Sequence, residues 1–121
     1  MHVIYGGAMT STDQTGSTTL DYDWDMIYNG LQTTVVNMAG TGDWDIDYTG
    51  SEGSYSFNMG WATGNGGISI PLMGCPDGMM TWYLDSYEVV LDFNDPEGMV
   101  TWTLKENGST VSSGTESMDC Y

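Results

Sequence analysis

Apolar and polar residues alternate with a period of two along much of this chain. Between residues 20 and 28, aromatic or aliphatic residues occupy the even positions, while Asp21, Asp23 and Asp25 occupy odd ones. Because successive side chains of a β-strand point to opposite faces, this rhythm predicts a strand with one apolar and one acidic face. The stretch 43–48 repeats the pattern, with Asp43, Asp45 and Asp47 alternating with Trp44, Ile46 and Tyr48.

The same alternation recurs in the stretches 54–61, 80–84, 87–93 and 99–105, and shorter strands are expected at 2–5, 33–38, 68–70 and 110–113. Asn29-Gly30, Asn107-Gly108 and the segment 94–98 are strong turn signals between them. The glycine-rich segments 40–42 and 64–67 are also expected to be turns. No useful length of chain has a helical period. The pattern therefore predicts an all-β fold, an antiparallel β-sandwich (jelly-roll or Ig-like) of about nine to eleven short strands.

The segment 10–19 is rich in Ser and Thr and separates a short first strand from the regular pattern. We therefore expect residues 1–19 to form an N-terminal strand with a polar linker, and residues 20–121 to form the sandwich domain. An extended segment of this kind can add a strand to the open sheet edge of another molecule. The residues expected to make this subunit contact are His2, Val3, Ile4 and Tyr5.

Charge narrows the classes of partner. The 121-residue chain carries a formal charge of −16, with Lys105 as its one Lys and no Arg. Such a surface repels phosphates and anionic lipids, so nucleic acid is not expected as a partner. No apolar run is long enough for a membrane span. Residues 1–6 lack the features of a signal peptide, so a secreted form is expected to be a mature chain.

The two aspartate stripes are candidate metal ligands. Alternate residues of a strand lie about 7 Å apart, so one strand cannot enclose a cation but two neighbouring strands can. Calcium prefers six to eight oxygen ligands, which carboxylates and loop carbonyls supply. The predicted calcium ligands are Asp21, Asp23, Asp25, Asp43, Asp45 and Asp47. A solvated acidic face in a salty medium explains the same residues without a specific site, and the sequence leaves both interpretations open.

Cys75 and Cys120 are the only cysteines. Two cysteines are too few for a zinc site, and an even count in a small β domain favours a disulfide between them. Two buried free thiols are the alternative. A disulfide would place the protein outside the reducing cytosol, in an extracellular setting or at a cell or virion surface.

The five tryptophans all fall on the apolar phase of their expected strands, which favours a role in the core. Aromatic rings on an open sheet face are also suited to stacking on sugar rings, and Tyr83, on the opposite phase from Trp82, is the candidate glycan contact. With a single His and no Arg, the chain offers little from which to build a nucleophile–histidine arrangement. The sequence therefore predicts no enzyme.

Two functional classes fit these observations. The first is a non-enzymatic extracellular structural subunit that self-assembles by β-strand addition into a filament, surface layer or virion coat, with cations on its acidic faces. The alternative is a secreted carbohydrate-binding β-sandwich module with structural calcium.

Overall fold

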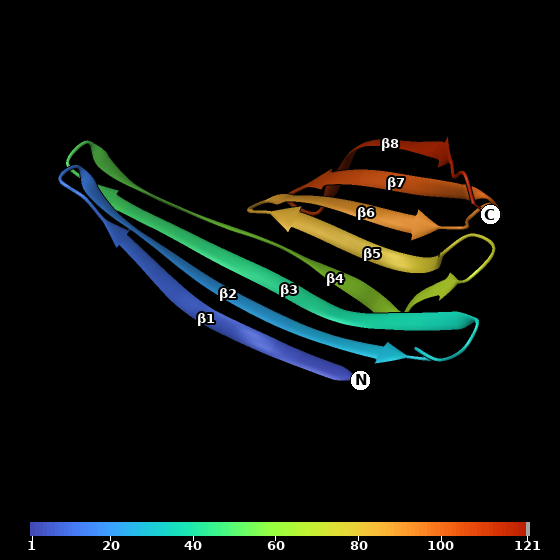
Figure 1. Ribbon diagram of the computed structural model, residues 1–121. Helices are drawn as coiled ribbons and strands as arrows, with labels where there is room; N and C mark the ends of the chain where they lie inside the picture. The colour runs from blue at the N-terminus through green and yellow to red at the C-terminus, as the bar shows by residue number, and fades with distance from the viewer. Residues whose placement is uncertain (121) are drawn as a thin grey trace.

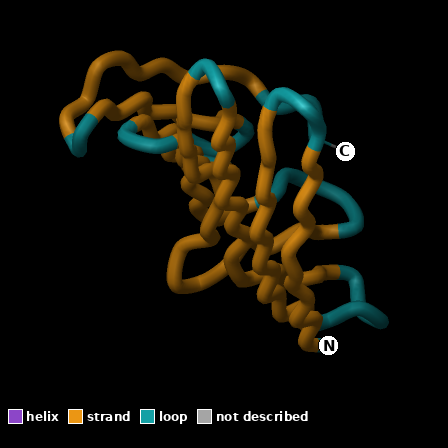
Figure 2. The backbone as a smooth tube through the Cα atoms, turned by 90° about the vertical axis from the view of Figure 1, so that its left-hand side faces the viewer, coloured by secondary structure: helices purple, strands orange, loops and turns teal. Residues whose placement is uncertain are grey.

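The computed structural model describes residues 1–120 and consists of one antiparallel sheet of eight strands (Figure 1). The order of strands in the sheet is the order along the chain, from β1 to β8. The strands are β1 (His2–Thr12), β2 (Gly16–Asn29), β3 (Val35–Gly50), β4 (Gly53–Pro71), β5 (Asp77–Leu84), β6 (Tyr87–Phe93), β7 (Met99–Glu106) and β8 (Ser109–Ser117). Figure 2 shows only strands and loops in this part of the chain, which accordingly contains no helix able to cross a membrane.

The all-β, antiparallel class is thus confirmed, whereas a sandwich of nine to eleven strands is not confirmed. The number of strands is lower because two glycine-rich segments expected to be turns lie inside long strands. The register between β3 and β4 shifts between Met38 and Thr41, and that between β4 and β5 shifts between Thr63 and Ile68. Gly67, with a φ of 70°, lies in the second of these irregularities. Glycine allows a strand to bulge and continue.

The N-terminal strand is longer than predicted. It runs from His2 to Thr12 and so includes Gly6, Gly7 and part of the segment expected to be a linker. All of it pairs with β2 of the same chain, from His2 opposite Ile27 to Thr12 opposite Ser17. The strand is therefore an edge of the sheet, with one side paired and the other free.

The register of the seven strand pairs sorts side chains onto two faces. Trp24 lies opposite Tyr5 and Gly42, and Gly42 lies opposite Trp61, which in turn lies opposite Trp82. Because directly opposed residues share a face, the aromatic residues of successive strands gather on one side of the sheet. We call this side the aromatic face, and the other side, which carries the six aspartates of β2 and β3, the aspartate face.

Glycines and aromatic rings are paired across the strands. Directly opposed pairs are Gly7 with Tyr22, Gly42 with Trp61, Gly60 with Tyr83, and Gly114 with Trp102. In each pair a Cβ on the glycine would come within 2.8 Å or less of an atom of the aromatic side chain. The ring therefore covers the backbone of the neighbouring strand, and any larger residue would displace it. Packing of the aromatic side chains therefore requires glycine at these positions.

Few side chains are fully buried within one chain. Met26, Trp61 and Ile68 are the buried hydrophobic residues of the described chain. The accessible surface is 7890 Å². A folded monomer of 13.2 kDa is expected to expose about 6,400 Å². The single sheet therefore leaves about a quarter more surface in contact with water than a compact domain of its mass.

Cys75 and Cys120 form the predicted disulfide, with their Cα atoms 4.9 Å apart. It joins the loop between β4 and β5 to the segment that follows β8, across 45 residues of sequence. Closing a loop of this length lowers the entropy of the unfolded chain and contributes about 4 kcal/mol in the chain-entropy model. In a sheet with so few buried side chains, this crosslink is a substantial part of the stability.

Candidate functional site: two open edges, an acidic face and an aromatic groove

The sheet has two outer strands, β1 and β8, and among residues 1–120 neither is paired on its outer side. Apart from His2, β1 carries no ionisable group other than the phenol of Tyr5, and the one charged residue of β8 is Glu116. Natural sheets protect their edges with lysine, proline, bulges or covering loops, since an open row of N–H and C=O groups invites pairing. These two strands carry no lysine or proline, and the one irregularity in their pairing is at Val111, near the start of β8.

The residues predicted to contact a neighbouring subunit lie at the start of β1. The His2 imidazole contacts the Asp25 carboxylate of β2, and the N-terminal amine donates to the carbonyl oxygen of Tyr28 at 2.7 Å. Ile4 is 71% exposed. The start of the strand is thus anchored to β2 on one side, while its outer side is available to another strand.

The aspartate stripes do lie on adjacent strands, as a shared site requires. Asp21 is directly opposite Asp45, and Asp23 is directly opposite Asp43. Like charges in opposed positions repel, so such a ladder needs a compensating partner. However, no three His, Cys, Asp or Glu side chains among residues 1–120 converge in an arrangement able to hold a metal ion.

Asn58 of β4 supplies part of the compensation. Its Nδ2 donates to Oδ1 of Asp43 at 2.6 Å and to Oδ1 of Asp45 at 2.7 Å. The hydroxyl of Tyr83 donates to the same Asp43 oxygen at 3.3 Å. Hydrogen bonds to ionised acceptors are stronger than those between neutral groups. Two neutral side chains therefore hold the middle of the aspartate face in place, a role the sequence pattern does not indicate.

Tyr83, the candidate glycan contact, lies on the aspartate face as its phase predicts. It is half-buried, with its ring over Gly60 and its hydroxyl at Asp43. Burial raises the pKa of the Tyr83 phenol, and the negative charges of Asp43 and Asp45 raise it further. The most exposed aromatic rings are on the aromatic face, where Tyr5 is 58% and Tyr55 is 61% exposed.

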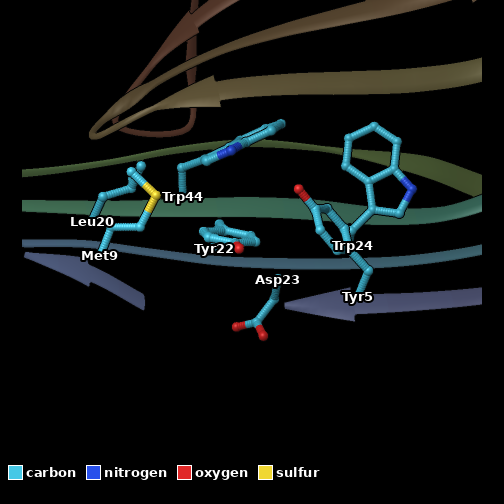
Figure 3. Close-up of a pocket in the computed structure, with 7 residues that line it drawn as sticks. All are labelled: Tyr5, Met9, Leu20, Tyr22, Asp23, Trp24 and Trp44. Atoms are coloured by element: carbon cyan, nitrogen blue, oxygen red, sulfur yellow. The ribbon is translucent and has the colours of Figure 1, made fainter. Parts of the chain in front are cut away.

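A groove of about 290 Å³ runs over β1, β2 and β3 on the aromatic face (Figure 3). Its lining comprises Tyr5, Met9, Leu20, Tyr22, Asp23, Trp24 and Trp44. The rings of Tyr5 and Tyr22 have their centroids 5.2 Å apart, and the rings of Trp24 and Trp44 meet edge to face at 6.1 Å. In Figure 3 the Asp23 carboxylate points away from these indoles, so the groove presents ring and thioether surface.

A second cluster of carboxyl groups, those of Asp77, Asp92 and Asp95, lies where β5 begins and β6 ends. Partial burial raises the pKa of the Asp92 carboxyl, and the neighbouring carboxyl groups of Asp95 and Asp77 raise it further. A raised carboxyl pKa means that the fold favours the protonated form. At neutral pH the ionised Asp92 is therefore a source of instability.

The chain matches no family model, no curated protein and no solved structure.

We expect Asn58→Leu to lower the free energy of unfolding by about 2 kcal/mol, because it removes two hydrogen bonds to ionised carboxylates. The loss should shrink in high salt, which screens the repulsion between the aspartates. Asn37→Leu, which breaks a neutral bond to the Gly66 carbonyl, is the control and should show no such salt dependence. Urea unfolding of the three proteins at low and high salt measures this, and equal salt dependence of both variants would contradict it.

Asp92→Asn should raise the melting temperature at pH 7, because it removes a carboxylate that the fold disfavours. The sign follows from the raised pKa: the stabilising protonated form is present below the unfolded pKa, near 3.8, and is lost as pH rises. The advantage of the variant should therefore shrink as the pH approaches 3.8. Glu97→Gln, in the exposed turn nearby, removes one charge as a control and should give a smaller gain. An unchanged or lower melting temperature for Asp92→Asn would oppose this account.

Proposed function

We propose that this protein is a non-enzymatic structural subunit that polymerises by β-strand addition. The observation that carries the proposal is the pair of open, nearly uncharged edge strands in a chain of charge −16. β1 and β8 have 11 and 9 residues, so one can cover most of the other. The proposed contact includes the predicted residues His2, Val3, Ile4 and Tyr5.

The direction of the edge strands favours an open polymer. Every neighbouring pair in the sheet is antiparallel, so with eight strands β1 and β8 run in opposite directions. The β8 edge of one copy therefore meets the β1 edge of the next in the antiparallel sense when both copies have the same orientation. Such a head-to-tail contact uses two different surfaces and extends indefinitely unless the rotation closes a ring. A filament, surface layer or virion coat is the proposed assembly.

The disulfide supports a location outside the reducing cytosol, so we place the subunit in an extracellular setting or at a cell or virion surface. We also propose that the two-layered β-sandwich predicted from the sequence forms in the assembly, where another chain supplies the second layer. Cations on the aspartate face would reduce the repulsion between subunits.

A carbohydrate-binding module is the second candidate, and the aromatic groove beside Trp24 and Trp44 is the observation that favours it. Planar rings in an open groove offer stacking surfaces for sugars. Titration of the protein with glycans, followed by tryptophan fluorescence, tests this candidate. Binding that survives Trp44→Phe but not Trp44→Ala would support stacking in the groove, whereas glycan binding by a stable monomer would favour this function over assembly.

Excess chelator should loosen the assembly at low salt if calcium occupies the opposed aspartates, because removing the ion restores the repulsion between Asp21 and Asp45 and between Asp23 and Asp43. Light scattering before and after chelation measures the change, with added calcium restoring the signal. If the scattering at low salt is the same with and without chelator, specific calcium binding is ruled out. Non-specific cations would then be the ones that neutralise the aspartate face.

The double variant Ala8→Lys with Ser113→Lys should abolish the polymer, because it places lysines on both edges that meet at the junction. Both positions are exposed on the aspartate face, so the aromatic face is unaltered. The control is Thr103→Lys, on the same face of the interior strand β7. Sedimentation velocity should show large species for wild type and control only. Large species that persist in the double variant would rule out edge addition.

A further inference from the structure

Among residues 1–120, no other element covers the aromatic face, whose exposed residues lie on β1, β4, β5 and β6. Tyr5, Tyr55, Met59, Trp82, Leu84 and Tyr87 lie on it, and each is between 36% and 61% exposed. Three further rings of this face, those of Tyr22, Trp61 and Trp102, lie over the glycines opposite them and so extend the apolar surface across the strands. Soluble monomers rarely leave apolar surface of this extent exposed, so it marks an interaction surface.

Charge separates this face from the other. Nine acidic residues lie within β1–β6, and the register places all of them on the aspartate face: Asp21, Asp23, Asp25, Asp43, Asp45, Asp47, Asp77, Glu88 and Asp92. Glu106 of β7 and Glu116 of β8 are the strand carboxylates on the aromatic face, and both lie near one edge. Two sheets that each carry a charge of −16 can therefore pack face to face only through their aromatic faces, which keeps the carboxylates of β1–β6 outside.

The area of exposed surface is also large enough for a stable interface with a second copy. The chain exposes about 1,500 Å² more than a folded monomer of its mass should. If each of two copies covered that excess on the other, the contact would total about 3,000 Å², within the range of permanent homodimers. Tyr, Trp, Phe and Met are the residues enriched in such interfaces, and Asp and Glu are depleted from them.

We propose that two copies of this chain pack aromatic face against aromatic face to form a two-layered β-sandwich. Each sheet supplies one layer, the rings of both interdigitate between the layers, and the aspartate faces point outward. Two sheets packed in this way lie about 10 Å apart. The inference rests on the proposed function and specifies it: edge addition extends each sheet, and face packing joins two sheets into one layered polymer.

The test separates the two contacts by working in the edge-blocked background, Ala8→Lys with Ser113→Lys. In that background we expect a particle of two chains by sedimentation equilibrium. Met59→Lys, on the aromatic face and 36% exposed, should weaken the dimer about 30-fold or more, because a charge at the centre of an apolar interface has no partner. Met79→Lys makes the same change on the aspartate face, at 45% exposure, and should leave the dimer intact.

The outcomes distinguish the two proposals. An edge-blocked protein that sediments as a single chain overturns the face-to-face dimer, while the proposal of edge addition stands. Equal effects of Met59→Lys and Met79→Lys also overturn it. If the edge-blocked protein still polymerises, the proposal of edge addition fails. Face packing is still supported in that case if Met59→Lys dissociates the particles and Met79→Lys does not. Met9→Lys, on the aromatic face at 60% exposure, repeats the test at a position where the fold is least affected.

Discussion

The structure depends on a strict alternation of side chains that is kept in register across neighbouring strands. In residues 21–25 of β2 and 43–47 of β3, every second residue is an aspartate, and the residues between are rings or aliphatic chains. Because Tyr22 lies opposite Trp44 and Asp23 opposite Asp43, the register gathers rings with rings and carboxylates with carboxylates. Slippage by one residue would place aspartates against indoles. The hydrophobic effect and the cost of placing carboxylates among rings therefore favour the same register.

That segregation has a cost on each face. On the aspartate face, opposed carboxylates repel, and the Nδ2 of Asn58 together with the Tyr83 hydroxyl offsets part of the repulsion. On the aromatic face, one layer of sheet cannot cover its own rings: Trp61 is buried, but Trp82 is 44% exposed. Both costs would fall in the proposed assembly, where another copy covers the rings and cations reach the carboxylates.

Much of the sheet could be predicted from the sequence. The alternation located the strands that carry Trp24, Trp44 and Trp102 and assigned each ring to the apolar phase, and Asn107-Gly108 forms the predicted tight turn with both φ angles positive, at 52° and 81°. The disulfide between Cys75 and Cys120 also followed from the sequence.

Other features could not be predicted, for physical reasons. Glycine permits both a turn and a bulge, so the sequence predicts turns around Gly40 and Gly67, whereas the strands continue through them. Gly6 and Gly7 have weak strand propensity, and only pairing with β2 reveals that β1 extends to Thr12. Alternation shows which face is apolar but not what covers it, so the number of layers could not be determined. The link from Asn58 to two aspartates depends on register alone.

The most direct measurement of the central claim is acrylamide quenching of tryptophan fluorescence in the edge-blocked protein and in the same protein with Met59→Lys. Acrylamide is neutral, so the charge of the chain does not repel it. If another copy covers the aromatic face, the indoles should be shielded in the first protein and quenched more strongly in the second. Equal quenching of both proteins, with the indoles open to acrylamide in each, would contradict the account.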